Sequence, residues 1–444
     1  MSAEVRPIRT AAEQALAEAF AARRAGLARD PLAKQREAAF HRFEAEGLPH
    51  RRIEDWKYTD LRALMREARP LAGPPDAAGI ARAKNAGALV HGIETRRIVL
   101  VDGAFVPELS DLAALEPGLA IVPMAQALAS GDPQVVPLIG TVAPTDDIAA
   151  ALNTAFMGDG VAIHLADGTA LARPLHLVFA YTAATAAAVF ARSLVVIGKG
   201  ARLSLIESHE GPADLDYQVN NALELVIGDD AKVERVKIGT EGTRALHIST
   251  LMAALGARAR FNDFSFTTGG AVVRNQLHVR FAGERAEAKI GGASLLTGRQ
   301  HVDTTLVVDH AARGGTSREL FKSVLDGESR GVFQGKIIVR PGAQQTDGRM
   351  MTRALLLSED AEADNKPELE IFADDVQCGH GATAGALDQD LLFYLKARGI
   401  PPHEAEALLI QAFVGEAIEA VEHEALREAL IGAAATWLEA REQP

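Results

Sequence analysis

The sequence predicts a mainly β fold, in which a β-solenoid core lies between helical regions at the two ends of the chain. Three observations support this prediction. Short β-branched runs alternate with Gly, Asp and Ala turns from about residue 160 to 377, a weak repeat runs through them, and good helix formers dominate both ends. We divide the chain into an N-terminal helical and mixed region (1–150), a β-helix core (151–385) and a C-terminal helical domain (386–444).

The repeat joins a strand, a turn and a second strand. Residues 197–203 (IGKGARL) resemble residues 227–233 (IGDDAKV) and 255–261 (LGARARF), and residues 281–286 (FAGERA) are a looser fourth copy. The first three turns are 30 and then 28 residues apart, counted from residue 198 to 228 to 256. One such unit cannot bury its apolar face alone, so neighbouring units stack and share a core. A β-sandwich built from hairpins is the alternative, because its turns also recur regularly.

The N-terminal region has recognisable element boundaries. Residues 30–31 (Asp-Pro) form a helix start, with a capping carboxylate followed by proline at the first helical position. Gly47 ends that helix, and Phe40 and Phe43 share its buried face. Residues 98–101 predict a short strand that enters a turn.

The C-terminal region predicts three helices. Asp388 caps a short helix that Gly399 closes, and the prolines at 401–402 begin the next one. Apolar residues near helical spacing mark the buried face of this second helix: Leu408, Leu409, Ala412, Phe413 and Ile418. A last helix covers residues 423–439.

The composition excludes several classes of protein. Hydrophobic residues make up 48% of the 444, enough for a large core, so a disordered chain is excluded. A net charge of −13 and only 5% aromatic residues argue against binding to nucleic acid. The start of the chain lacks a signal-peptide run, and no stretch of about 20 apolar residues could span a membrane. We therefore expect a cytoplasmic protein without membrane contact.

Common enzyme signatures are missing. No P-loop, no H-E-x-x-H and no G-x-S-x-G motif occurs. Residues 379–385 (GHGATAG) superficially resemble a dinucleotide loop, but their spacing differs from G-x-G-x-x-G and no β-α-β unit surrounds them. We therefore expect no catalytic residues and no enzymatic activity.

Cys378, Gly379 and His380 form the candidate functional site. Cys378 is the only cysteine, which excludes an intramolecular disulfide and a cluster site made from this chain's thiolates alone. In an extended strand Cys378 and His380 share one face, and thiolate and imidazole both suit iron and its clusters. Such a site needs further ligands, from this chain or another. The alternatives are a small buried cysteine with a structural histidine, or a catalytic Cys–His pair, which this close spacing disfavours.

Two segments resemble the SufB/SufD family of iron–sulfur cluster assembly proteins. Residues 355–400, which include the CGHGATAG string, are similar to the signature block of the family. Residues 54–61 (EDWKYTDL) resemble the N-terminal mark of SufD-type members, although on their own they predict an amphipathic helix that buries Trp56 and Tyr58. SufB-type members carry more cysteines, so the single cysteine favours the SufD type.

The resemblance implies a right-handed parallel β-helix flanked by helical domains. It also implies a complex of one SufB, one SufD and two copies of the ATPase SufC. The β-helices of SufB and SufD pair, and each C-terminal helical domain (here about residues 388–413) holds one SufC. A transient iron–sulfur cluster forms at the SufB–SufD interface, where His380 matches the family histidine implicated in cluster formation, as a metal ligand completed by partner-chain ligands. Cys378 matches a cysteine two positions before it. The isolated chain can lack a cluster, and a homodimer is expected for chain purified alone.

Two other functions stay open from the sequence. A structural paralogue would stabilise the assembly complex without ligating a cluster, and His380 would then be structural. A β-solenoid enzyme acting on polysaccharides would recruit residues such as Asp303, Asp309 and His310. Such enzymes are usually secreted, and these three residues are more typical of strands and turns.

Overall fold

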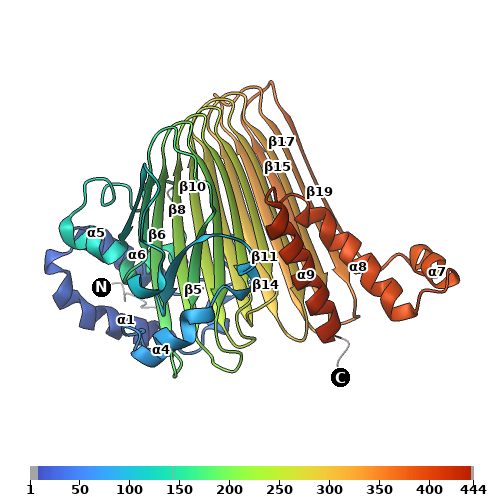
Figure 1. The fold of residues 1–444 in the computed structure, drawn as a ribbon, viewed down its shortest axis with the longest axis horizontal. Coiled ribbons are helices and arrows are strands. Elements are labelled where there is room, and N and C mark those ends of the chain that lie inside the picture. Colours follow the sequence, from blue (N-terminus) through green and yellow to red (C-terminus); the bar gives the residue numbers. More distant parts are fainter. Residues whose placement is uncertain (1–8, 144, 442–444) are drawn as a thin grey trace, which may run out of the picture.

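The computed structural model describes residues 9–143 and 145–441, and a two-sheet β-solenoid forms its centre (Figure 1). Within these residues one sheet has ten strands, in the order β19-β17-β15-β13-β11-β9-β7-β5-β1-β2, and the other has nine, in the order β18-β16-β14-β12-β10-β8-β6-β4-β3. We call the first the odd sheet and the second the even sheet, because from β4 onward they contain the odd-numbered and the even-numbered strands. From β4 onward the chain alternates between the two sheets, and neighbouring strands are parallel. The predicted β-solenoid is confirmed, and a sandwich of hairpins is wrong because hairpins pair antiparallel strands.

The strands have the following limits. The odd sheet contains β1 (Arg96–Val101), β2 (Ala104–Phe105), β5 (Leu175–Ala180), β7 (Arg202–Glu210), β9 (Lys232–Gly239), β11 (Arg260–Thr267), β13 (Glu287–Leu296), β15 (Thr316–Leu325), β17 (Asp347–Leu356) and β19 (Gln377–Gly385). The even sheet contains β3 (Leu119–Pro123), β4 (Val161–Leu165), β6 (Ala188–Ile197), β8 (Gln218–Ile227), β10 (Leu246–Leu255), β12 (Val272–Phe281), β14 (His301–His310), β16 (Arg330–Val339) and β18 (Glu362–Ile371).

The helices flank this core. They are α1 (Ala11–Arg24), α2 (Ala33–Glu46), α3 (Leu61–Leu64), α4 (Ala77–Arg82), α5 (Met124–Ser130), α6 (Ile148–Phe156), α7 (Gln389–Ala397), α8 (Pro402–Ile418) and α9 (Glu424–Arg441). Among the described residues, none of these helices has both the length and the apolar character that crossing a bilayer requires.

The sequence repeat corresponds to the turns that lead from the even sheet to the odd sheet. Asp230 and Arg258 occupy equivalent turn positions with positive φ angles of 58° and 56°. Asp230 donates its backbone N–H to the carbonyl of Ala257 in the next coil at 2.8 Å. A Cβ atom on Gly256 would lie 2.7 Å from the backbone nitrogen of Asp229. The turns therefore stack too closely to admit a side chain at the repeated glycine.

Small and apolar side chains fill much of the interior of the solenoid, which we call the lumen. The alanine that follows each repeat turn is completely buried: Ala201, Ala231, Ala259 and Ala286. Leucine, valine, isoleucine and phenylalanine side chains from both sheets pack against these alanines. Each coil thus covers the apolar face of its neighbour, which a single coil could not bury.

The strand predicted at residues 98–101 lies within β1, which pairs in parallel with β5. Asp102 and Gly103, with φ angles of 49° and 84°, then form the predicted turn into β2. The odd sheet therefore begins with a strand from the N-terminal region of the chain.

Helices α1, α2 and α6 pack on the outer face of the even sheet. Phe20 stacks on Phe40 with ring centroids 4.0 Å apart, and Phe156 meets both rings edge to face. Phe40 and Phe43 are buried and Gly47 follows the last residue of α2, as predicted. This aromatic cluster holds the N-terminal helices to the solenoid.

The start of α2 differs from the prediction. The Asp30 carboxylate accepts the N–H of Leu32 at 2.8 Å, so Pro31 and Leu32 form a turn and the helix begins at Ala33. Asp30 also lies 2.8 Å from the buried guanidinium of Arg36. Asp30 therefore closes the turn and forms an ion pair with Arg36 instead of capping the helix.

Residues 54–61 fasten the N-terminal region to the even sheet. They contain one 3₁₀ turn, η2 (Glu54–Trp56), so the prediction of an amphipathic helix burying two aromatic side chains is wrong. Trp56 is buried beneath the guanidinium of Arg274, which lies 3.8 Å from its ring centroid, whereas Tyr58 is only partly buried. Arg274 also donates to the Asp55 carbonyl at 2.6 Å.

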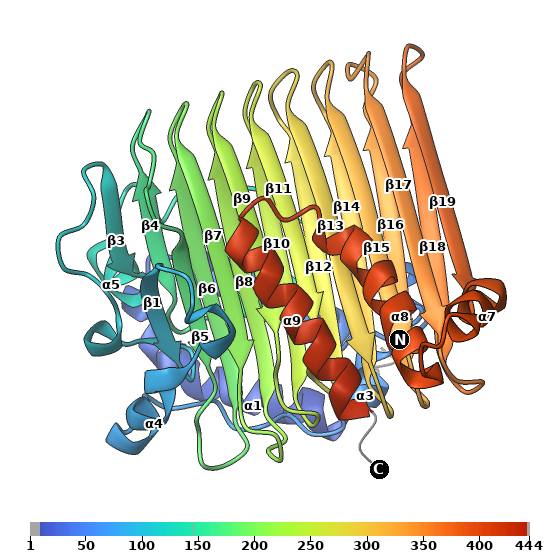
Figure 2. The same cartoon turned by 45° about the vertical axis from the view of Figure 1, so that its right-hand side comes forward.

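The C-terminal helices lie across the outer face of the odd sheet (Figure 2). Asp388 accepts the N–H groups of the first turn of α7, Gly399 follows that helix with φ of 87°, and α8 begins at Pro402, all as predicted. Figure 1 shows α7 standing away from the sheet, beyond α8.

The buried face of α8 differs from the prediction. Ile410, Val414, Ala417 and Ile418 face the sheet, whereas Leu408 is exposed. Of the five predicted residues, only Ile418 is fully buried. This helix is apolar around most of its circumference, and contact with the sheet selects one of several possible stripes.

Candidate functional site

Strand β19, which carries Cys378 and His380, is the last strand of the odd sheet. It pairs with β17 on one side, where Gln377 donates its N–H to the Thr346 carbonyl at 2.8 Å. No strand in the described part of the chain pairs with the other side. Because backbone groups alternate in direction along a parallel strand, the N–H and C=O groups of Cys378 and His380 face this open edge.

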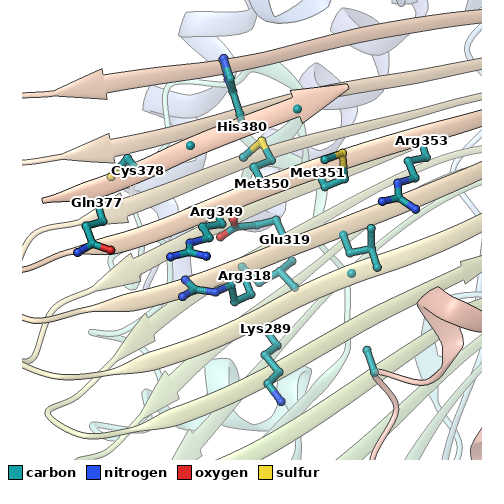
Figure 3. A pocket seen from close by; sticks show the side chains of 16 residues that line it. Lys289, Arg318, Glu319, Arg349, Met350, Met351, Arg353, Gln377, Cys378 and His380 are labelled. Atoms are coloured by element: carbon teal, nitrogen blue, oxygen red, sulfur yellow. The ribbon is translucent and has the colours of Figure 1, made fainter. Parts of the chain in front are cut away.

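The side chains of Cys378 and His380 share one face of β19, two residues apart in an extended strand. Cys378 is half-buried and packs against the lumen core. This burial raises the pKa of the Cys378 thiol, and the nearby Asp347 carboxylate raises it further. His380 is exposed at the end of the solenoid, and its side chain points away from Met350 (Figure 3).

A groove of about 710 Å³ lies beside β19, with walls formed by β13, β15, β17 and β19 (Figure 3). Four basic side chains line it: Lys289, Arg318, Arg349 and Arg353. Arg318 and Arg349 lie 2.5 and 3.2 Å from the Asp347 carboxylate. Arg353 lies 3.3 Å from Glu416 of α8. Two carboxylates of the chain, Asp347 and Glu416, therefore offset part of the positive charge of the groove.

Glu319 also belongs to this site, although no sequence motif marks it. It lies in β15 opposite Met350 and is only 3% exposed. Neither of its carboxylate oxygens has a hydrogen-bond partner among the described residues. Burial raises the pKa of Glu319 to about 8, and the Ser317 hydroxyl and Arg318 charge offset only part of this shift. Side chains two residues apart in a strand share one face. Once the limits of β15 are known, this spacing places Glu319 on the inward face together with Ser317 and Phe321.

Replacing Glu319 with glutamine is expected to stabilise the protein more at pH 8 than at pH 5. The folded pKa of about 8 exceeds the ordinary 4.5, so between these values the folded state binds more protons than the unfolded state. Stability associated with the protonated carboxyl is present below about pH 4.5 and is lost as the pH rises toward 8. Glutamine does not titrate. The variant's advantage in free energy of unfolding should therefore grow by on the order of 3 kcal/mol from pH 5 to pH 8.

Urea denaturation at the two pH values measures this advantage. Glu359→Gln, at an exposed turn, is the matched control and should show no such growth. An advantage of Glu319→Gln that stays constant with pH would contradict the prediction.

The residues considered for a polysaccharide-active enzyme do not form one site. Asp303 is buried and pairs with Arg274. Asp309 pairs at 2.8 Å with Arg340 on the surface, and His310 is buried in the lumen. Asp309 and His310 are adjacent in β14 and therefore face opposite sides of the sheet. The structure does not bring these three residues together.

Two family models match nearly the whole chain. The SufBD core domain of the SUF system for FeS cluster assembly matches residues 179–413, and the SufBD protein N-terminal region matches residues 10–177. The chain belongs to the SufBD family. The SufBD core match includes β19, and so both Cys378 and His380 lie within it.

Individual SufBD proteins are similar over most of their length. An iron–sulfur cluster assembly SufBD family protein of Synechocystis is 30% identical over 88% of this chain and 87% of its own length. The iron–sulfur cluster assembly protein SufD of Escherichia coli K12 is 29% identical over 91% of this chain and 92% of its own length. The predicted family is confirmed, and with it a role in iron–sulfur cluster assembly as a SufBD protein of the SufD type.

Proposed function

We propose that this chain is a non-enzymatic scaffold subunit that contributes His380 to a cluster assembly site at the interface with a SufB-like partner, in the cytoplasm. The observation that carries this proposal is the exposed His380 on a strand with an open edge. Imidazole is a suitable iron ligand, and an exposed side chain can reach iron held by another chain. The nascent cluster is the cargo of this site.

The single cysteine makes a partner necessary. Iron–sulfur clusters are usually held by four protein ligands, mostly thiolates. This chain offers one thiol, Cys378, which is half-buried and whose raised pKa disfavours the thiolate. His380 is therefore the stronger candidate ligand of the two, and the remaining ligands come from the partner.

The open end of the solenoid supports pairing through the β-helix. Strands β18 and β19 end their sheets, and each leaves one edge without a described partner strand. Unpaired edges readily accept a strand from another chain. Ile371 and Phe372, at the end of β18, are exposed apolar residues that such a partner would cover. A partner strand beside β19 would place its own side chains next to His380.

Co-expression with SufB-like and SufC-like partners tests the proposed function. The chain expressed alone should be purified without a bound cluster. The chain co-expressed with both partners should be recovered in a complex that acquires iron and acid-labile sulfide on reconstitution. Failure to form any complex with these partners would contradict the proposal.

The C-terminal helices support docking of a SufC-like ATPase. Leu391, Phe393 and Tyr394 are exposed apolar residues of α7, with 71% of the Phe393 surface accessible. No residue of α7 is fully buried, and within the described part of the chain this helix packs lightly against α8. Apolar side chains gathered on the exposed face of such a helix are typical of a protein interface.

The mechanical link from α8 to the site supports a role in ATP-driven opening. Glu416 of α8 binds Lys322 of β15 and lies 3.3 Å from Arg353 of β17. Strand β17 is the direct neighbour of β19. ATP-driven dimerisation of two ATPase subunits would pull on α7 and α8, and these ion pairs would transmit the pull toward the strand that carries His380.

Replacing Phe393 with aspartate is expected to abolish co-purification of the ATPase and to leave the fold unchanged. An exposed side chain contributes little to folding, whereas a charge at the centre of an apolar interface costs several kcal/mol, roughly 2 to 5. Leu64→Asp, at an exposed apolar residue of α3, is the matched control and should bind the ATPase normally. Normal ATPase recovery with Phe393→Asp would exclude α7 from the interface.

A structural paralogue without a cluster ligand is the second candidate. It retains the same fold and partners, and the open edge of β19 favours it equally. The exposure of His380 favours the ligand proposal, because a structural histidine is usually buried and hydrogen-bonded.

The open edges also favour a homodimer of the isolated chain. Light scattering of the purified chain is expected to give about twice the chain mass of 47.1 kDa. A monomer mass would contradict this prediction but would leave pairing with a SufB-like partner intact.

A further inference from the structure

The lumen contains a group of metal-binding side-chain types far from β19. His209 lies near the end of β7, Glu241 lies between β9 and β10, and His247 lies near the start of β10. All three side chains are buried, and one ligand atom from each lies within 4.8 Å of those of the other two. Six inter-strand steps separate β7 from β19 in the odd sheet, roughly 29 Å. We call these residues the His209 cluster; it is independent of the proposed role of His380.

Each member of the His209 cluster has one buried atom without a hydrogen-bond partner among the described residues. These atoms are Nε2 of His209, Nε2 of His247 and Oε2 of Glu241. The other atoms are engaged: His247 Nδ1 contacts Glu241 Oε1, and His209 Nδ1 lies 3.3 Å from the Tyr181 hydroxyl. Buried polar atoms nearly always have partners. His209 Nε2 faces Glu207 Oε2 at 3.7 Å, beyond hydrogen-bond distance. Each residue of the cluster therefore keeps one ligand atom that the described residues leave unsatisfied, which favours a bound occupant.

The charges around the His209 cluster favour a cation. Arg235 pairs with both Glu207 and Asp263, and Lys237 lies beside them in the lumen. With Glu241, these residues make three carboxylates and two basic groups, all of them buried. The formal charge of the group is negative, and an uncompensated buried charge is costly. A divalent cation beside Glu241 would compensate it.

We propose that His209, Glu241 and His247 bind one divalent transition-metal ion inside the solenoid. Two imidazoles and one carboxylate are a known ligand set for Zn²⁺ and for non-haem Fe²⁺. The ligands come from three successive coils, so the ion links these coils in the way that a structural metal does. Because the three side chains are buried, the ion enters during folding.

The metal content of the full-length protein tests this proposal. The protein is purified twice with a tag that binds no metal, once in air and once under anaerobic conditions. Zinc and iron are measured in both preparations after gel filtration. About one equivalent per chain is expected in the wild type. Glu241→Gln is expected to retain about a tenth of that or less. His310→Gln, at another buried lumen histidine, and His380→Ala should both keep the metal.

Refolding provides the second readout. Wild-type protein refolded with Zn²⁺ or Fe²⁺ should melt several degrees higher than protein refolded with a chelator, because the ion binds only the folded state. The proposal would be overturned if the folded wild type held less than about 0.1 equivalents of metal per chain, both as purified and after refolding with either ion. That result would show that water fills the cluster. Equal metal content in wild type and Glu241→Gln would overturn it as well. If Glu241→Gln does not fold, the metal content and melting temperature of the refolded wild type test the proposal without it.

Discussion

Replacing Gly283 with alanine is expected to destabilise the solenoid by about 3 kcal/mol or more. Gly283 belongs to the fourth repeat turn, between β12 and β13. A Cβ atom there would lie 2.0 Å from the backbone nitrogen of Ala257 in the preceding coil. A backbone atom in a paired coil cannot rotate away as the end of a side chain can. The two coils must therefore separate locally, and urea denaturation measures the loss.

Gly415→Ala in α8 is the matched control, because it makes the same chemical change where no heavy atom lies within 4 Å of the added Cβ. A helical alanine in place of glycine is expected to stabilise by about 0.5 to 1 kcal/mol. The contrast between the two variants tests the stacking of turns directly. Similar stability of Gly283→Ala and the wild type would contradict the geometry of the repeat.

The solenoid could be predicted because its turns impose residue types. Each repeat turn needs a glycine that the adjacent coil would otherwise contact and an alanine in the lumen, as at Gly256 and Ala259. The face of α8 could not be predicted, because Leu408 and Ile410 are equally apolar and only contact with the sheet distinguishes them. The start of α2 was missed because Asp30 has a second partner, Arg36, that sequence spacing alone does not identify.

The candidate site could be predicted only where its residues are neighbours in sequence. Cys378 and His380 share a face because an extended strand alternates, and that needs no tertiary information. Glu319 joins them through the pairing of β15, β17 and β19, which depends on the register of three coils. The His209 cluster combines residues from three coils for the same reason. The register between coils depends on the folded chain as a whole and cannot be predicted from a short motif.

Replacing His380 with alanine is expected to leave the fold and the complex intact and to lower the cluster content about tenfold or more. The side chain is exposed, so its removal should change the free energy of unfolding by less than about 0.5 kcal/mol. The backbone of residue 380 still presents its N–H and C=O to the open edge, so strand pairing with the partner persists. The cluster loses an iron ligand, and the one remaining ligand candidate of this chain is half-buried.

Two further variants separate ligation from other effects. Cys378→Ser is expected to lower the cluster content less than His380→Ala does, because the Cys378 thiol is half-buried and its raised pKa disfavours the thiolate. His403→Ala removes an exposed histidine of α8 and should have no effect on the cluster. A larger loss with Cys378→Ser than with His380→Ala would reverse the assignment of the two residues.

The iron and acid-labile sulfide bound per intact complex decide whether His380 is a ligand of the cluster. The His380→Ala chain is co-expressed with SufB-like and SufC-like partners, and the complex is isolated by gel filtration and analysed beside the wild type and His403→Ala. We expect an unchanged subunit composition with about a tenth of the wild-type cluster content. A wild-type cluster content in the intact His380→Ala complex would remove His380 from the site, and a complex that fails to assemble would make it an interface residue instead.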